Sequence, residues 1–378
     1  MSLQNIQYRP TVAEIDLNAL RHNVKEIQKR VPSGRSIMAI VKANAYGHGA
    51  SFCVRTLEGC GVRDFGVATL EEGMELRGGG IRGNIFVLGG LLTSSLGEFI
   101  QFRLRPVLHQ VDEVRRFAAW LKESNRECQA HIKLDTGMGR LGIFPSEIED
   151  LVSLVKNNQL LKVEGFLTHL ARADEEDLSP SERQFILFRE LRRILAEKGV
   201  TVPICHIANS AAIIDNRLDG FEMVRPGIML YGAYPHERQR TMIDLKPVMK
   251  LKSRIISLKR FKSGSPISYG GTFVTGRESL IAVLPIGYAD GYPRLISNKG
   301  SVLIRGKRAA VAGRVCMDMT MIDVTDVPEA AVGDEAVLIG SQGEGQIRAE
   351  ELAQWAETIS YEIFCGISSR VPRIYLGM

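Results

Sequence analysis

The segment at residues 36–50 ends an apolar run in a lysine that could act as a nucleophile. It reads SIMAIVKANAYGHGA, in which Lys42 closes the run and Tyr46 and His48 follow among small residues. A lysine at a strand end usually lays its stem on apolar surface and its ammonium in water. In a partly desolvated pocket near other cations, its pKa falls instead, and the amine can form a Schiff base with an aldehyde.

Further groups with chemical potential follow other short apolar runs. They comprise cations, a histidine, an amide, a hydroxyl and a glycine turn: Arg140, His169, Asn209, Ser210, Arg225 and Gly227. Glycine and serine groups after the later strands of a barrel form a ready phosphate site. An amine that captures aldehydes, next to a phosphate site, matches pyridoxal phosphate.

Each of these residues also has a purely structural interpretation. His169 alone would more often be a hydrogen-bonded structural histidine, and Arg140 could form an ion pair with Asp135. The Pro-Gly pair after Arg225 supplies a turn wherever it occurs. All of these interpretations would have to hold together on one face of one barrel, so we favour the functional interpretation.

Parallel strands alternating with helices would position these groups. Apolar runs bounded by Gly, Asn, Asp or Pro predict strands at 36–43, 64–70, 84–90, 104–109, 130–135, 162–170, 204–208 and 223–232. Amphipathic segments between them, such as 111–124 and 179–199, predict helices. The alternation predicts an α/β fold with a (β/α)8 TIM-type barrel, in which functional groups collect at the carboxyl ends of the strands. An open doubly wound sheet is the second choice.

From about residue 245 the pattern changes to strands joined by turns. Runs such as VMKLKSRIISLKRF and SLIAVLPIGY lie close together, and one helix is expected within 348–360. This pattern predicts a mostly β C-terminal domain. We therefore predict a barrel at 1–240, which carries the cofactor lysine, and a mostly β domain at 241–378.

Composition and charge argue against several classes of protein. The 378 residues are 45% hydrophobic and carry a formal net charge of +5 without a basic stripe, so nucleic-acid binding is not expected. The six cysteines form no C-x-x-C pair, which favours reduced thiols over disulfides or a metal site. No stretch approaches the roughly 18 apolar residues of a membrane span. We expect a cytoplasmic protein without a metal, nucleic-acid or membrane partner.

A series of segments resembles the signature segments of the alanine racemase family. In order from residue 36 to residue 375 they are AIVKANAYGHG, GMGRLG, THLARADE, HIANSAA, VRPGIMLYG, SYGGT, IGYADGYPR, GRVCMDMTMIDV and RVPRIY. Members of this family use pyridoxal 5'-phosphate and consist of a barrel followed by a β domain. The resemblance implies an isomerase that interconverts L- and D-alanine and supplies D-alanine for bacterial peptidoglycan.

The resemblance also implies a role for each matching residue. Lys42 would bind the cofactor and act as one acid–base group, and Tyr269 of the partner subunit in a homodimer would act as the other. The remaining cofactor contacts would come from Tyr46, Arg140, His169, Asn209, Ser210, Arg225, Gly227, Ile228 and Tyr361. Arg140, Cys316, Met317, Asp318 and Tyr288 would contact the substrate or line its entrance. Lys133 would be a carbamylated lysine, as in some relatives.

Arg225 is the most informative residue, because the resemblance places it opposite the pyridine nitrogen. Arginine stays protonated and only donates hydrogen bonds, so the ring nitrogen must remain an unprotonated acceptor. The ring is then a weaker electron sink, which favours quick reprotonation over transamination or decarboxylation. Racemisation removes a proton from one face and returns it on the other, and Lys42 and Tyr269 would act from opposite faces.

Other functions remain open at the level of sequence. A basic amino-acid decarboxylase of the same architecture would need a carboxylate where Arg225 lies. A pyridoxal-phosphate carrier would need the barrel alone, whereas this chain has a second domain with Tyr269. A broad-specificity or serine racemase is the closest alternative, because the sequence does not reveal the size of the substrate pocket.

Overall fold

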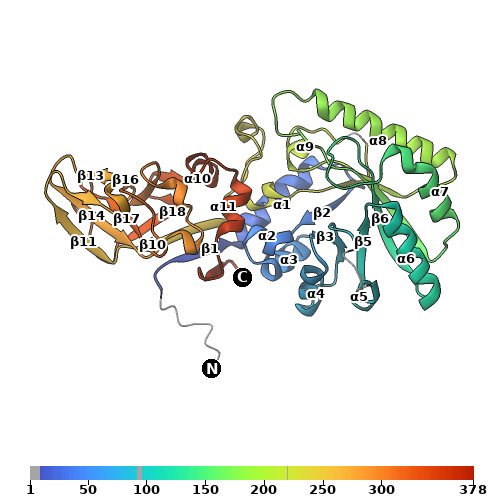
Figure 1. Ribbon diagram of the computed structural model, residues 1–378, viewed down its shortest axis with the longest axis horizontal. Coiled ribbons are helices and arrows are strands. Elements are labelled where there is room, and N and C mark those ends of the chain that lie inside the picture. Colours follow the sequence, from blue (N-terminus) through green and yellow to red (C-terminus); the bar gives the residue numbers. More distant parts are fainter. Residues whose placement is uncertain (1–8, 92–95, 219) are drawn as a thin grey trace.

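A closed barrel of eight parallel strands forms one end of the computed structural model, which describes residues 9–91, 96–218 and 220–378 (Figure 1). Neighbouring strands pair in chain order, and β2 pairs with β9 to close the ring. The strands are β2 (Ser36–Ile40), β3 (Asp64–Val67), β4 (Asn84–Val87), β5 (Leu104–Leu108), β6 (Cys128–Lys133), β7 (Leu161–Leu167), β8 (Ile204–His206) and β9 (Met223–Val224). The predicted TIM-type barrel is confirmed, since each predicted strand segment contains or overlaps one of these strands.

Helices follow the barrel strands and cover the barrel. They are α3 (Ala50–Gly59), α4 (Leu70–Gly78), α5 (Leu96–Gln101), α6 (Val111–Ser124), α7 (Ile148–Lys156), α8 (Ser179–Glu197) and α9 (Ser210–Ile214), and α1 (Leu17–Arg30) precedes the first strand. In α6 the side chains of Val114, Phe117 and Leu121 are fully buried. Their spacing of three and four residues puts them on one face, as the sequence pattern predicts. Within the described ranges, no helix combines the length and apolar character needed to cross a membrane.

An extended sheet forms the other end of the molecule and confirms the mostly β C-terminal domain. Its order is β11-β14-β17-β16-β15-β18-β10-β1-β20, with β19 beside β18 and a separate β12-β13 pair. The strands are β1 (Val12–Asp16), β10 (Met249–Arg254), β11 (Ser257–Phe261), β12 (Pro266–Ile267), β13 (Phe273–Val274), β14 (Ser279–Leu284), β15 (Ser301–Ile304), β16 (Lys307–Val311), β17 (Thr320–Asp323), β18 (Glu335–Gln342), β19 (Gly345–Ile347) and β20 (Arg373–Leu376).

One strand of this sheet comes from the N-terminus. β1 runs antiparallel to β10, with Ile15 opposite Met249, and parallel to β20, with Ala13 opposite Arg373. The range of 1–240 predicted for the barrel includes this segment, because a short apolar run does not reveal which distant strand it pairs with. The domain boundary near residue 240 stays a prediction.

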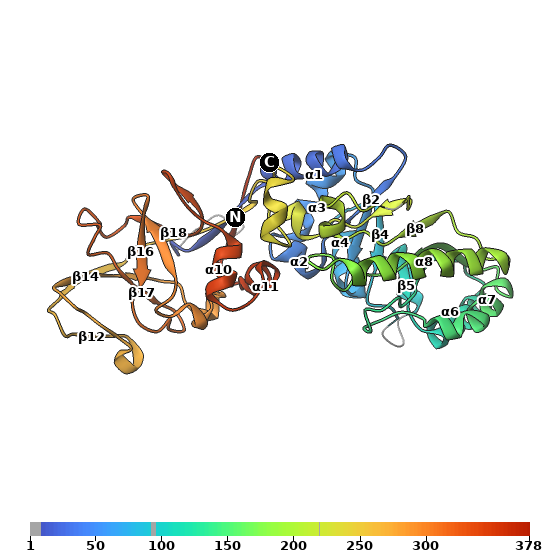
Figure 2. The same cartoon turned by 90° about the horizontal axis from the view of Figure 1, so that it is seen from above.

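A continuous apolar core joins the two ends of the molecule. Ile15 of β1 and Leu251 of β10 belong to the same buried cluster as Phe65 in the barrel. Helices α10 (Ala349–Trp355) and α11 (Ser360–Gly366) lie between the sheet and the barrel in both views (Figures 1 and 2). The sheet and the barrel are therefore packed together, and α11 contacts α2 (Lys42–Tyr46).

Candidate active site

Lys42 lies just after β2 and begins a strained turn. Ala43, Asn44, Ala45 and Tyr46 all have φ between 52° and 54°. This left-handed conformation costs about 1–2 kcal/mol per residue when the residue is not glycine. Consecutive residues in such a conformation persist only when their surroundings hold them there, and they cluster at functional sites. The turn therefore marks the end of β2 as a candidate site.

Hydroxyl and N–H groups meet beside this turn. The N–H of Gly227 donates to Oγ of Ser210 at 2.9 Å, and a Cβ on Gly227 would lie 2.7 Å from the hydroxyl of Tyr46. The ring centroids of Tyr46 and Tyr361 are 5.9 Å apart. Burial raises the pKa of both tyrosines, so both remain hydrogen-bond donors. Within the described residues, the N–H of Ile228 has no acceptor. The tyrosine hydroxyls and this N–H are hydrogen-bond donors that suit a phosphate.

Arg225, which follows β9, is buried and held by neutral acceptors. Its Nη1 donates to Nδ1 and O of His206 at 3.0 and 2.9 Å. Its Nη2 donates to O of Thr168 at 2.6 Å, O of Ile207 at 3.2 Å and Nδ1 of His169 at 3.3 Å. Burial lowers the pKa of Arg225 to about 9, which leaves it protonated at neutral pH. In the described part of the chain its Nε–H has no acceptor, so one donor is free for a ligand.

Two buried histidines continue this hydrogen-bond chain into the barrel. Because Arg225 donates to Nδ1 of His206, that nitrogen accepts and Nε2 carries the proton. Nε2 then donates to Nδ1 of His131 at 2.9 Å. Burial lowers the pKa of His131 to about 3 and that of His206 well below its ordinary value, so both are neutral. Neither histidine was predicted from the sequence, because His131 lies inside β6 and His206 is the last residue of β8, so neither follows its strand.

Several cationic groups surround the amine of Lys42. Burial lowers the pKa of Lys42, and Arg140 lowers it further. Lys133 ends β6, and burial, with help from Arg140 and Arg225, lowers its pKa to about 8. Burial and then Arg225 lower the pKa of His169 well below its ordinary value. The predicted cations and the histidine therefore lie near one another at the mouth of the barrel.

The local hydrogen bonds around Arg140 and Asn209 test the structural interpretation of Arg140 and show a capping role for Asn209. Arg140 is exposed and does not pair with Asp135, whose carboxylate accepts the N–H groups of Gly137 and Met138 at 2.8 and 3.0 Å. The structural interpretation of Arg140 as the ion-pair partner of Asp135 is therefore wrong. The side-chain oxygen of Asn209 accepts from the N–H of Ala212 at 3.1 Å and caps α9. Its contact with a cofactor stays a prediction.

The other predicted residues form a second group on the β domain. Tyr269 begins the short turn η5 (Tyr269–Gly271), and its side chain is 70% exposed. It lines an open pocket of about 740 Å³ together with Cys316, Met317 and Asp318. The N–H of Tyr288 donates to O of Cys316 at 3.0 Å, which fixes the Tyr288 turn beside this pocket. Within the described residues, the N–H of Met317 has no acceptor.

The two groups are separate within one chain. Figure 1 and Figure 2 both place the β12–β13 pair, which flanks Tyr269, in the β domain and away from α2 at the barrel. Lys42 and Tyr269 therefore do not form one site within a single chain.

An ion-pair network that was not predicted from the sequence supports the second group. Asp318 pairs with Arg370 at 2.7 Å, and Arg370 also lies 3.5 Å from Asp290. The fully buried Asp290 pairs with Arg9 at 2.5 Å and accepts the N–H of Gly287 at 3.0 Å. IGYADGYPR and RVPRIY contain Asp290 and Arg370, but sequence alone does not reveal that they pair.

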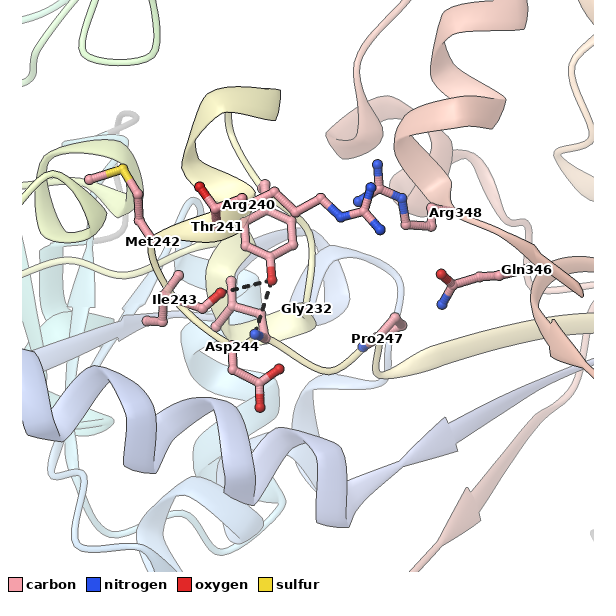
Figure 3. Close-up of a pocket in the computed structure, with 11 residues that line it drawn as sticks. Gly232, Arg240, Thr241, Met242, Ile243, Asp244, Pro247, Gln346 and Arg348 are labelled. Atoms are coloured by element: carbon pink, nitrogen blue, oxygen red, sulfur yellow. Dashed lines mark hydrogen bonds between the residues drawn. The ribbon is translucent and has the colours of Figure 1, made fainter. Parts of the chain in front are cut away.

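Another cavity, of about 420 Å³, lies at the junction between the barrel and the β domain (Figure 3). Arg240 and Arg348 extend toward each other there, and both bond to the carboxylate of Glu237, at 3.3 and 3.0 Å. None of the predicted site residues lines this cavity. It is therefore separate from the candidate active site.

Comparisons with known proteins agree with this arrangement. Residues 15–235 match the model of the alanine racemase N-terminal domain, and residues 248–375 match that of the C-terminal domain. An alanine racemase from Halothermothrix orenii is 47% identical, with 97% of each chain covered, and one from Geobacter sulfurreducens is 45% identical, with 98% of each covered.

Solved structures give the same result. Alanine racemase from Streptomyces lavendulae superposes with a TM-score of 0.93 at 35% identity, covering 99% of this chain and 98% of that one. The Bacillus anthracis enzyme with bound L-Ala-P superposes with a TM-score of 0.90 at 36% identity, covering 98% of this chain and 96% of that one. The chain therefore belongs to the alanine racemase family of isomerases.

Proposed function

We propose that the protein interconverts L- and D-alanine with pyridoxal 5'-phosphate bound at the mouth of the barrel. The observation that carries this proposal is the combination of Lys42, whose pKa is lowered, with Arg225, whose two terminal nitrogens are used and whose Nε–H is free. The amine of Lys42 suits the aldehyde of the cofactor, with which it can form a Schiff base. The fixed guanidinium of Arg225 only donates, so it suits a pyridine nitrogen that accepts a hydrogen bond.

The residues present at the barrel mouth fit this cofactor. Tyr46, Ser210, Tyr361 and the N–H groups of Gly227 and Ile228 would hold the phosphate, where the close approach of Tyr46 leaves no room for a Cβ on Gly227. Lys42 would hold the aldehyde carbon, and Arg225 would donate to the pyridine nitrogen. Arg140, His169 and Asn209 would complete the contacts. When bound, pyridoxal phosphate would delocalise the negative charge that develops at Cα of the amino acid.

Two groups of this chain would move the proton. Lys42 would take or give it on one face of Cα, and Tyr269 would do so on the other. Tyr269 is exposed on the β domain and lies away from Lys42 of its own chain. We therefore propose a homodimer in which Tyr269 reaches the barrel of the partner, where Arg225 is the cation that assists it and His169, whose lowered pKa leaves it neutral, lies beside Arg225.

The pocket around Tyr269 would bind the substrate. The free N–H of Met317 would donate to the carboxylate of alanine, with Cys316, Asp318 and Arg140 close by. Tyr288, which is 42% exposed, would line the entrance. Lys133 would carry a carbamate, because its pKa near 8 supplies the neutral amine that reacts with carbon dioxide.

The reaction would serve cell-wall synthesis by supplying D-alanine for peptidoglycan. All six cysteines are unpaired. Unpaired thiols support a reducing compartment such as the cytoplasm as the place of action.

Chiral chromatography of a panel of L-amino acids incubated with the protein and pyridoxal phosphate tests the function. We expect rapid formation of D-alanine and loss of both the activity and the absorbance of bound cofactor in Lys42→Ala. Faster racemisation of serine or of many side chains would favour the broad-specificity alternative, and release of carbon dioxide would favour a decarboxylase. No cofactor uptake by the unaltered chain would overturn the proposal.

A further inference from the structure

The left-handed turn after Lys42 is held largely by bonds within its own segment. The N–H of Gly47 donates to O of Ala43 at 2.9 Å, and the N–H of Ala50 donates to Oδ1 of Asn44 at 2.7 Å. These bonds hold the later part of the turn. The first N–H of the turn, that of Ala43, points elsewhere and needs an acceptor from another part of the chain.

That acceptor is the carboxylate of Glu72 in α4. Its Oε1 accepts the N–H of Ala43 at 2.6 Å, and its Oε2 accepts the N–H of Ala68 at 2.7 Å. One carboxylate therefore bridges the end of β2, where Lys42 lies, and the end of β3. Both contacts are charge-assisted hydrogen bonds, which are stronger than those between neutral groups.

Glu72 also has a purely local role, from which the bridging role must be separated. It lies three residues after Thr69, the N-cap of α4, and the two residues form a capping box. In a capping box the glutamate reaches back to the N–H of its own N-cap. Here that contact, to Thr69, is the longest of the three at 3.4 Å, and the short bonds go to Ala68 and Ala43. The geometry favours the bridge over the cap.

We propose that Glu72 is a positioning residue that fixes the turn after Lys42 and so aims Lys42 and Tyr46 at the cofactor. This inference rests on the proposed function for what Lys42 does, but the positioning itself concerns the protein alone. The sequence gives no sign of this role, since a glutamate in the first turn of a helix is ordinary.

The charge of Glu72 also acts on Lys42. Burial and Arg140 lower the pKa of Lys42, whereas Glu72 and Cys365 raise it, and Lys133 and His169 lie near enough to interact with it. Glu72 thus limits how far the pKa of Lys42 falls. A glutamine would keep one acceptor oxygen, replace the other by an NH2 group that cannot accept, and lose the charge, so Glu72→Gln should keep part of the bridge and remove the electrostatic effect on Lys42.

The test uses the full chain without cofactor and measures hydrogen exchange by mass spectrometry in peptides covering residues 42–48. In Glu72→Ala we expect exchange in this segment to be roughly 10- to 100-fold faster, the factor set by one hydrogen bond to a charged group. Glu72→Gln, which keeps one of the two acceptor oxygens, should lie between the unaltered chain and Glu72→Ala. Thr69→Ala, which breaks the other half of the capping box, and Glu71→Ala, which removes an exposed neighbouring carboxylate, should leave the segment unchanged.

A second readout is the pH dependence of the chemical modification of Lys42 by an amine reagent. Glu72→Gln should move its apparent pKa down, and Glu71→Gln should not. Unchanged exchange in Glu72→Ala, or an equal effect of Thr69→Ala, would overturn the proposal. If the chain failed to racemise alanine, the proposed function would fall while these results stood, because neither experiment involves cofactor or substrate.

Discussion

Replacing Lys133 by methionine should stabilise the cofactor-free protein at neutral pH. Lys133 is 6% exposed, and burial with nearby Arg140 and Arg225 lowers the pKa of its amine from 10.5 to about 8. At about 1.4 kcal/mol per pKa unit, that difference corresponds to roughly 3 kcal/mol. This net shift already includes the attraction to Asp135, which raises the pKa, so we expect a gain of roughly 3 kcal/mol.

The pH dependence follows from the direction of the shift. Between pH values near 8 and 10.5 the unfolded chain keeps the Lys133 proton while the folded chain has released it. The unfolded state then binds more protons, so the stability of the unaltered protein rises with pH across this window. Below pH 8 both states are protonated and the full penalty applies. The advantage of Lys133→Met should therefore be largest at pH 7 and shrink toward pH 10.5.

Urea denaturation in buffer free of carbon dioxide, followed by circular dichroism at several pH values, measures this difference. Lys162→Met is the matched control, because Lys162 is exposed on the neighbouring strand β7. Added bicarbonate should stabilise the unaltered chain, since a carbamate on Lys133 forms only in the folded state, and should not affect Lys133→Met. Parallel pH profiles for the unaltered chain and Lys133→Met would refute the reasoning.

Two further substitutions test other parts of the site. Gly227→Ala should weaken pyridoxal phosphate binding about tenfold or more, because the new Cβ would lie 2.7 Å from the Tyr46 hydroxyl. Absorbance titration measures the affinity for the cofactor. An unchanged affinity would contradict the proposed phosphate site. Arg225→Lys should lower the free energy of unfolding by about 2–3 kcal/mol, because one ammonium replaces two nitrogens that donate to several buried acceptors. Urea denaturation without cofactor measures the change. A loss below about 0.5 kcal/mol would contradict this prediction, because it would show that the buried acceptors tolerate the absence of the guanidinium.

The barrel and much of its rim could be predicted from the sequence. The apolar runs are short and sharply bounded, and parallel strands put their carboxyl ends on one face. Lys42, His169 and Arg225 each follow such a run, so their positions along the chain were enough to group them. Their mutual effects on pKa agree with that grouping.

The remaining features depend on contacts that a local pattern does not contain. Alanine has no preference for positive φ, so the left-handed conformation of Ala43 and Ala45 was not predictable. The bridge made by Glu72 exists only because β3 lies beside β2. His131 and His206 alternate with apolar residues in their strands, and their link to Arg225 depends on the closure of the barrel.

The central claim is that each active site combines Lys42 of one chain with Tyr269 of the partner subunit. The direct measurement mixes inactive Lys42→Ala and Tyr269→Phe proteins, lets their subunits exchange, and follows D-alanine formation by chiral chromatography. Random reassortment makes half of the dimers mixed, each with one intact site. Activity should therefore recover to about a quarter of that of the unaltered protein. No recovery, although mass spectrometry detects mixed dimers, would contradict the account.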